Sequence, residues 1–242
     1  MGFQYSVQCV EGKLNNMKTR YEKNFDMLSE AEMLLLLKSR VCVIGCGGLG
    51  GHIIEQLARL GVGNITVVDG DVFVESNLNR QLFSTTETLG KSKAESAVTR
   101  IAQVNSDINI LPVTSLLTEE NCEEIIKNHQ VVVDAVDNIA TRLLLQKKCE
   151  ELGIPLVHGA IAGWYGQVTT IFPGDKTLDF LFKSSENYGI EKQLGNPSFT
   201  PALVASIQVS EVLKIIIKRG ELLRKRILYI DLLEQEYIHI NI

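Results

Sequence analysis

The chain has 242 residues, of which 45% are hydrophobic and 22% charged, an ordinary globular mixture with enough apolar material for a sizeable core. This composition excludes a disordered, collagenous or coiled-coil chain, and the length fits one domain or at most two. The formal net charge of −5 lacks the strongly basic field of a protein that binds duplex DNA or an anionic membrane.

Residues 1–39 are predicted to form an N-terminal arm followed by a helix. Ser29 and Glu32 fit a capping box at the start of a helix that runs to Lys38. Residues 1–13 lack the apolar core of a signal peptide. A cytoplasmic protein is therefore the default expectation.

Residues 40–242 are predicted to form a single unit that begins with alternating strands and helices. Val41–Ile44 is a continuous apolar run typical of a strand buried on both faces. Leu49, Ile53 and Leu57 follow it at helical spacing. Short connections between such elements imply right-handed crossovers and a parallel sheet. Strands are expected over 41–44, 65–69, 108–113, 131–136 and 156–158, and helices over 91–104, 119–128 and 138–152.

The pattern changes after Gly166. Residues 167–172 and 227–242 are predicted to be strands without helical crossovers, around one long helix over 199–217. That helix is interrupted by Gln208, Glu211 and Lys214, so no membrane span is expected. Residues 173–201 are polar and aperiodic, and a loop of that length is usually functional or mobile. The predicted fold class is α/β: a Rossmann-like, mostly parallel sheet with helices on both faces, extended by C-terminal antiparallel strands.

A glycine-rich loop lies where the first predicted strand turns into a helix. Gly45, Gly47, Gly48 and Gly50 permit a tight turn and let backbone N–H groups approach a phosphate at the positive end of the helix. Asp69 ends the second strand 24 residues after Gly45, where its carboxylate can accept from a ribose hydroxyl. The bare GxGxxG spacing points to NAD, and the loop by itself leaves a dinucleotide and ATP both open.

The segment after this loop bears on that choice. A cluster of polar and cationic side chains follows the second strand, which a hydride-transfer site does not need and a triphosphate does. The cluster comprises Asp71, Asn77, Arg80, Gln81 and Lys93. The alternative is that Arg80 and Lys93 lie on solvated faces.

Asp137 closes another predicted strand, where ligands of open α/β sheets bind. Its carboxylate could hold Mg²⁺, or it could cap the following helix together with Asn138, since Asp and Asn both cap well.

The five cysteines are odd in number and include no CxxC pair, so they indicate neither a disulfide framework nor a zinc site. Cys42 and Cys46 are expected to be small buried side chains, although the start of a helix could lower the pKa of Cys46. The four histidines are too scattered for a metal pattern, and His158 merely follows a strand near the proposed site.

Four spaced motifs resemble the ThiF/MoeB/HesA family of ubiquitin-activating-like adenylyltransferases: GCGGLGGHIIEQLARLGVGNITVVDGD, SNLNRQ, GKSKAES and DAVDN. The resemblance covers roughly Arg20 to the C-terminus. It implies an enzyme, typically a homodimer, that uses ATP to adenylate the C-terminal glycine carboxylate of a small ubiquitin-like sulfur carrier protein ending in Gly-Gly, with release of pyrophosphate. Residues 40–242 would then be one adenylation domain, and 173–201 its crossover loop, under which the carrier's tail would thread.

The resemblance also implies roles for particular residues. Gly45, Gly47, Gly48 and Gly50 would line the phosphate loop, and Asp69 would bind the ribose. The triphosphate contacts would come from Asn77, Arg80, Gln81 and Lys93. Asp137 would hold magnesium, with Asn138 and Arg142 supporting its loop. Arg80, Lys93 and Asp137 would be the catalytic groups, and Trp164 and Tyr165 would either touch the carrier or pack inside.

Three departures from the family pattern matter. Relatives of the sulfur-transfer type often carry two CxxC pairs for structural zinc, and this chain has none. No cysteine follows Cys149, so a covalent step on the crossover loop is not expected. Arg20 to Asn24 resembles an RYxR segment whose second Arg reaches the partner subunit's ATP, but Lys23 stands in its place and cannot make a bidentate phosphate contact. Either Lys23 would then bind the nucleotide as a point charge, or Arg20 would substitute for the missing Arg, or activity would be reduced.

Other functions remain open at this level. A relative that adenylates and dehydrates modified tRNA would need a basic surface, for which the run from Lys214 to Arg226 is the candidate and against which the net charge argues. A non-catalytic nucleotide-binding subunit is favoured slightly by Lys23 and the missing loop cysteine. An NAD dehydrogenase is the remaining alternative. Nucleic acid and membrane are not expected among the partners.

Overall fold

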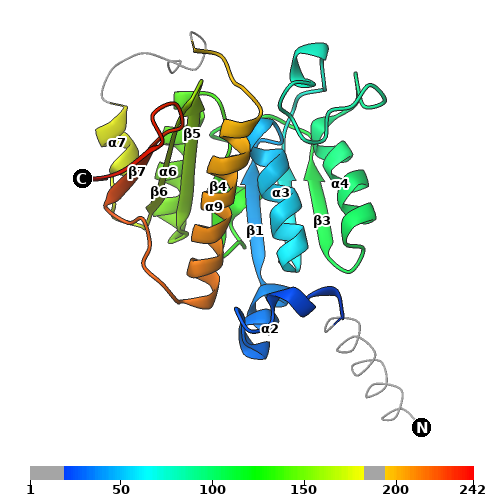
Figure 1. Cartoon of the computed structure of the whole chain (residues 1–242), viewed down its shortest axis with the longest axis horizontal. Coiled ribbons are helices and arrows are strands. Elements are labelled where there is room, and N and C mark those ends of the chain that lie inside the picture. Colours follow the sequence, from blue (N-terminus) through cyan, green and yellow to red (C-terminus); the bar gives the residue numbers. More distant parts are fainter. Residues whose placement is uncertain (1–18, 183–193) are drawn as a thin grey trace.

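The computed structural model describes residues 19–182 and 194–242, which fold around an eight-stranded sheet (Figure 1). The strands are β1 (Arg40–Ile44), β2 (Asn64–Val68), β3 (Asn109–Val113), β4 (Val131–Asp134), β5 (Leu156–Ala162), β6 (Tyr165–Ile171), β7 (Arg226–Asp231) and β8 (Glu236–Asn241). The α-helices are α2 (Glu30–Lys38), α3 (Gly48–Leu60), α4 (Lys93–Val104), α5 (Cys122–Ile126), α6 (Ile139–Leu152), α7 (Thr177–Leu181) and α9 (Phe199–Ile217). Two short 3-10 helices, η1 (Glu22–Asn24) and η2 (Glu75–Asn77), lie in connections.

The sheet order confirms the predicted fold class. The strands run β3-β2-β1-β4-β5-β6-β7-β8. All pairs from β3 to β5 are parallel, while the pairs from β5 to β8 are antiparallel. Since β1 is central and its neighbours run to either side of it, the chain reverses its direction of winding between β1 and β4, where α/β proteins bind ligands.

Helices cover both faces of the sheet, and β1 shows how the sequence fills two cores. Val41 and Val43 pack with α3, α4 and α9 on one face. Cys42 and Ile44 pack with α5, α6 and α7 on the other. Cys42 is fully buried, as expected for a small apolar side chain.

Helix α9 is a core helix whose buried polar side chains include Gln208 and Glu211. By length and composition it could cross a membrane, but it packs against α3 and the central strands. Glu211 Oε2 accepts from Thr170 Oγ1 at 2.5 Å and from Leu223 N at 2.7 Å. Gln208 Nε2 donates to the Asp134 carbonyl oxygen at 2.9 Å. These contacts explain the polar interruptions of the helix, because each one ties α9 to the sheet.

Two predicted segments differ from the structure. The expectation of a loop without regular structure over 173–201 is wrong at α7, while residues 183–193 lie outside the described part of the chain. Leu178 is fully buried, and its N–H donates to Gln146 Oε1 at 2.7 Å, so packing against α6 stabilises this short helix without a local periodicity. Residues 227–242 form the β7–β8 hairpin, whose turn is closed by Asp231 Oδ1 accepting from Leu233 N.

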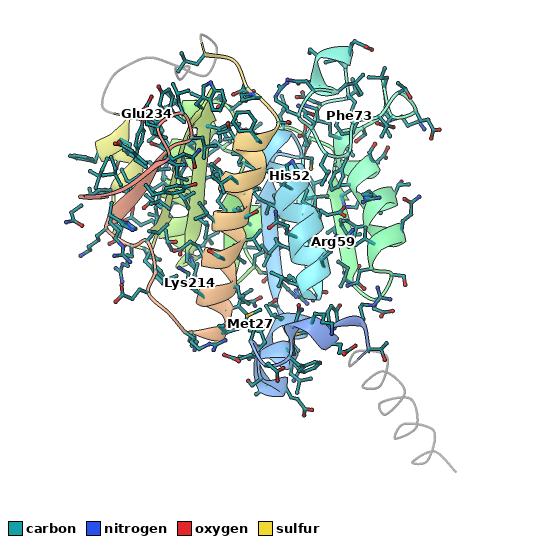
Figure 2. All side chains as sticks on the ribbon, viewed as in Figure 1. Met27, His52, Arg59, Phe73, Lys214 and Glu234 are labelled. Atoms are coloured by element: carbon teal, nitrogen blue, oxygen red, sulfur yellow. The ribbon has the colours of Figure 1, made fainter. Side chains whose placement is uncertain are left out.

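The described N-terminal residues pack beneath the sheet, at the amino ends of its parallel strands. The predicted capping box of Ser29 and Glu32 is present, and Glu32 pairs with Arg219 just beyond α9. Asn105 Nδ2 donates to Tyr21 Oη at 2.7 Å, and both side chains are buried. Figure 2 shows Met27 near the end of α9 that carries Lys214, with Phe73 at the opposite end of the molecule. Residues 19–38 therefore share the core of the sheet domain.

Substitution of Asn105 by Ala is expected to loosen this N-terminal segment. The variant leaves the buried Tyr21 hydroxyl without its donor and removes one of two donors to the Ala58 carbonyl oxygen, at a cost of about 2 kcal/mol in unfolding free energy. Urea denaturation measures the difference. Asn109→Ala, at an exposed position of β3, is the control and is expected within about 0.5 kcal/mol of wild type. An equal loss in both variants would contradict the assigned role.

Candidate functional site

A cavity of about 360 Å³ lies at the carboxyl ends of β1, β2 and β4, the edge that the sequence predicted. The structure brings most of the predicted site residues to its walls: Gly45, Gly47, Gly48, Asp69, Asp71, Arg80, Gln81, Lys93, Asp137, Asn138 and Arg142. They come from widely separated segments, so the cavity is a product of the tertiary fold.

Four predicted residues lie elsewhere. Gly50 packs against the Gly45 carbonyl oxygen within the glycine loop. Asn77 is buried, and its Oδ1 accepts from Val74 N at 3.0 Å. Arg20 and Lys23 lie with the N-terminal segment at the far end of the sheet. There Arg20 donates to the Val104 carbonyl oxygen, and Lys23 pairs with its neighbour Glu22. Within one chain, neither cation contributes to this cavity.

Close backbone packing leaves no room for a side chain at two positions of the glycine loop, Gly45 and Gly50. Gly45 has a φ of +99°, and a Cβ there would lie 2.5 Å from the Ala135 carbonyl oxygen. A Cβ on Gly50 would lie 1.8 Å from the Gly45 carbonyl oxygen. Helix α3 begins at Gly48 directly after this turn, so its first N–H groups and its positive dipole end lie at the cavity.

Asp69 joins the glycine loop to the end of β2. Its Oδ2 accepts from Cys46 N at 2.7 Å and its Oδ1 accepts from Asp71 N at 2.9 Å. Burial raises the pKa of the Asp69 carboxyl, while the Cys46 N–H and Lys93 act in the opposite direction. Burial also raises the pKa of the Cys46 thiol well above its ordinary value, so Cys46 is a packing residue.

Two of the cationic side chains at this cavity, Lys93 and Arg80, differ in their exposure and in their partners. Lys93 is only 7% exposed, and its Nζ pairs with Asp71 Oδ2 at 2.9 Å, so the solvated-face alternative is wrong for this residue. Arg80 is half-buried, and its Nη1 donates to the Ser76 carbonyl oxygen and to Asn79 Oδ1. Both groups can donate to an anion from positions that other contacts already restrict.

In the turn after β4, two neighbouring residues have different contacts: one caps a helix and the other faces the cavity. Asn138 Oδ1 accepts from Thr141 N at 2.9 Å, so Asn138 is the N-cap of α6. Asp137, one residue earlier, is exposed and lines the cavity. Across residues 19–182 and 194–242, no group of three or more His, Cys, Asp or Glu side chains could hold a metal ion. A single carboxylate fits Mg²⁺ shared with substrate phosphates, because this ion usually takes one or two protein carboxylates and completes its shell with phosphate and water.

Several wall residues were not predicted. Ser115, Leu116 and Leu117 follow the carboxyl end of β3, and Leu116 contributes an exposed apolar side chain to the wall. The rule that ligands bind at the carboxyl ends of strands could have found them. No pattern in the sequence pointed to Asn196, which also lines the cavity. Its Oδ1 and Gln81 Oε1 are buried without a partner, which leaves two acceptors available at the cavity wall.

Gly50 is packed against backbone whereas Gly47 lines the cavity, so substitutions at these two positions are expected to have different effects. Gly50→Ala is expected to lower the unfolding free energy by at least about 3 kcal/mol, because the new methyl group collides with backbone. Gly47→Ala meets only the Gln81 amide at 3.5 Å, so its melting temperature is expected to stay within about 2 °C of wild type while nucleotide affinity falls. Calorimetric unfolding and titration with ATP measure the two effects. Equal destabilisation by both changes would contradict this division.

Comparison with known proteins agrees with this geometry. The ThiF family profile matches residues 21–242. The SAMP-activating enzyme E1 of Haloferax volcanii is 40% identical over 205 residues, covering 84% of this chain and 76% of that protein. The molybdopterin-synthase adenylyltransferase of Haemophilus influenzae is 34% identical over 201 residues, covering 81% and 82%.

Solved structures show the same fold at lower identity. E. coli MccB with ATP gives a TM-score of 0.78 at 20% identity, covering 92% of this chain and 70% of that one. The E. coli tRNA N6-threonylcarbamoyladenosine dehydratase TcdA in complex with ATP gives 0.71 at 24% identity, covering 83% and 95%. With the family profile matching nearly the whole described chain, the protein belongs to the ThiF family and is an adenylyltransferase.

Proposed function

We propose that this protein uses ATP to adenylate the C-terminal glycine carboxylate of a small ubiquitin-like sulfur carrier protein, with release of pyrophosphate. The observation that carries the proposal is the convergence of Arg80, Lys93 and Asp137 on the N-terminus of α3 in one cavity. The names of the 34–40% identical relatives, a SAMP-activating enzyme and a molybdopterin-synthase adenylyltransferase, support this choice of substrate.

The chemistry requires no general base, because the attacking carboxylate is already ionised near neutral pH. A carboxylate oxygen forms a bond to the α-phosphorus, the bond to the bridging oxygen breaks, and pyrophosphate leaves with that electron pair. The protein contributes placement and charge: Lys93 and Arg80 donate to phosphate oxygens while charge develops there. Magnesium held by Asp137 would neutralise further phosphate charge.

The carrier would dock on the open face of the antiparallel strands. Tyr165 stacks on Tyr229 at 6.2 Å between ring centroids, and strand pairing places Ile238 and Ile240 on the same face. Ile238 and Ile240 are 44% and 45% exposed. These four residues define the apolar surface, and Ile161 of the neighbouring β5–β6 hairpin lines the cavity from the opposite face of the sheet. An extended C-terminal tail would therefore have to pass around the end of this hairpin to reach the phosphate site.

The nearby Trp164 belongs to the rim of this path. It is 44% exposed and packs against Phe199 with ring centroids 4.7 Å apart. The alternative that Trp164 packs inside is therefore wrong: its ring lies against Phe199 of α9 and leaves an exposed apolar edge that could contact a carrier.

A homodimer is part of the proposal. Arg20 and Lys23 lie at the end of the sheet opposite the cavity, so they could reach a nucleotide only in another subunit. Lys23 has a side chain that is 92% exposed, which leaves it free to extend as a point charge. We further propose that the enzyme works in the cytoplasm and contains no structural zinc.

ATP–pyrophosphate exchange tests the reaction. Exchange is expected to need Mg²⁺ and one carrier from a panel of proteins ending in Gly-Gly. Arg80→Ala is expected to lower kcat by about 10²–10³-fold, the usual loss for a group that stabilises developing charge, and Asp137→Asn by at least about tenfold. Arg59→Ala removes an exposed cation from the other end of α3 and is the control.

Each pattern of exchange has a distinct meaning. Carrier-dependent exchange that both site changes lower to the expected extent, and that Arg59→Ala leaves unchanged, would establish adenylation and identify the partner. ATP binding without exchange for any carrier would contradict the proposal and direct attention to an RNA substrate or a non-catalytic subunit.

The docking surface makes a separate prediction. Ile240→Glu places a charge on the apolar surface and is expected to raise the KM for the carrier at least about tenfold, with the KM for ATP unchanged within about twofold. Leu111→Glu, on the opposite edge strand β3, changes an apolar side chain that is even more exposed and is expected to leave both values unchanged. Equal effects of the two substitutions would argue against docking at this face.

A further inference from the structure

A row of polar side chains crosses three neighbouring strands next to the cavity. His158 on β5 is fully buried, and its Nδ1 lies 2.6 Å from Asp134 Oδ2 on β4. Its Nε2 lies 3.2 Å from Gln167 Nε2 on β6. Arg142 on α6 follows at the other end of the row, with its Nε 3.6 Å from Asp134 Oδ2. The row therefore runs from the β6 strand to a residue that lines the nucleotide cavity.

The contacts fix the protonation state of the imidazole. Burial lowers the pKa of His158 more than Asp134 raises it, so the ring is neutral near pH 7. A carboxylate can only accept, so Nδ1 carries the proton and donates to Asp134. Nε2 is then an acceptor for the Gln167 amide N–H. Every hydrogen-bonding atom of the ring is satisfied in this one tautomer.

Asp134 controls the geometry of the turn that carries Asp137. Its Oδ1 accepts from Val136 N at 3.0 Å. On the other side of the turn, Arg142 Nη2 donates to the Val136 carbonyl oxygen at 2.8 Å. The peptide groups of Val136 are thus held from both sides, and Asp137 follows directly. A rotation of the Asp134 carboxylate would release the turn and Arg142 together.

Phe182 shields this arrangement. Its ring meets the His158 ring edge-on with centroids 6.1 Å apart, and the Arg142 guanidinium lies 5.7 Å from its centroid. With Asp134 and His158 both fully buried, solvent cannot replace the imidazole as the donor to the carboxylate. The orientation of Asp134 therefore depends on His158.

We infer that His158 is a positioning residue of the nucleotide site: by donating to Asp134, it fixes the turn of residues 134–138 and Arg142 in the conformation that receives ATP. The inference rests on the proposed function only for the identity of the nucleotide. The imidazole touches neither substrate nor the reacting atoms.

Three variants separate positioning from packing. His158→Leu keeps the volume roughly but removes the donor. His158→Asn restores an amide N–H at the δ position and can still donate to Asp134. Thr169→Val is the matched control, because Thr169 is fully buried opposite His158 on β6 and donates only to the Leu223 and Arg226 carbonyl oxygens.

The primary measurement is ATP affinity by isothermal titration, with and without Mg²⁺, alongside the melting temperature of each variant. His158→Leu is expected to bind ATP at least about tenfold more weakly, the equivalent of about 1.4 kcal/mol, and His158→Asn to recover to within about threefold of wild type. Thr169→Val is expected to lose thermal stability with ATP affinity unchanged within about twofold. In protein labelled with ¹⁵N at histidine, the His158 signals of the wild type are identified as those that are missing from the spectrum of His158→Asn. In the absence of nucleotide, these wild-type signals are expected to show a neutral ring protonated at Nδ1.

The outcomes separate this inference from the proposed function. Wild-type affinity in His158→Leu, no recovery in His158→Asn, or a ring protonated at Nε2 would each overturn the positioning role. Wild-type protein that binds ATP without carrier-dependent exchange would overturn the proposed reaction alone, and the variant series would still decide the role of His158.

Discussion

Backbone-to-backbone packing between the glycine loop and the turn after β4 is the constraint on which the site depends. The Gly45 position faces the Ala135 carbonyl oxygen so closely that even one methyl group cannot be accommodated. This contact brings the N-terminus of α3 beside the turn that presents Asp137, so the two halves of the cavity are placed relative to each other by main chain. Side chains then need to fix only local orientation. Such a site is rigid before any ligand arrives, which reduces the entropy lost on binding.

Two charged side chains of the cavity, Lys93 and Asp69, have partners within the protein. Lys93 is paired with Asp71, and Asp69 is held by main-chain N–H groups. A buried ammonium without a partner would be costly, so the ion pair with Asp71 holds the Lys93 side chain in place. In the proposed reaction, a polyphosphate would offer more negative charge than one carboxylate, and Lys93 would need only to turn its donors toward it. Asp71, an acidic residue beside a proposed anion site, would then be the partner that Lys93 exchanges for phosphate.

The sequence predicted the Rossmann-like half well because its signals are local. Apolar runs, glycine punctuation and a capping box each depend on residues within one turn or strand, and the structure bears them out from α2 to α6. The strand after Pro155 is longer than predicted because its pairing with β6 extends it to Ala162. Helix α7 was missed for a similar reason, since Leu178 and its contact with Gln146 are tertiary.

For the site residues, too, local motifs could be read from the sequence and tertiary contacts could not. Residues in contiguous motifs, such as Lys93 and Asp137, were found, and the structure places them at one cavity. The row of His158, Asp134 and Gln167 joins three strands and leaves no pattern in the chain. Only the sheet register brings these side chains together, because Asp134 pairs with His158 across β4 and β5.

Asn138 caps a helix while its neighbour Asp137 faces the cavity, and this difference bears on how such a domain can change during evolution. Asn138 alone caps α6, a contribution of about 1 kcal/mol to stability, and the neighbouring carboxylate contributes to no described hydrogen bond of that cap. In the proposed reaction, loss of Asp137 would remove a magnesium ligand without removing support from the scaffold. A gene copy could thus lose catalysis by a single substitution at this turn and keep its folded shape and its surfaces.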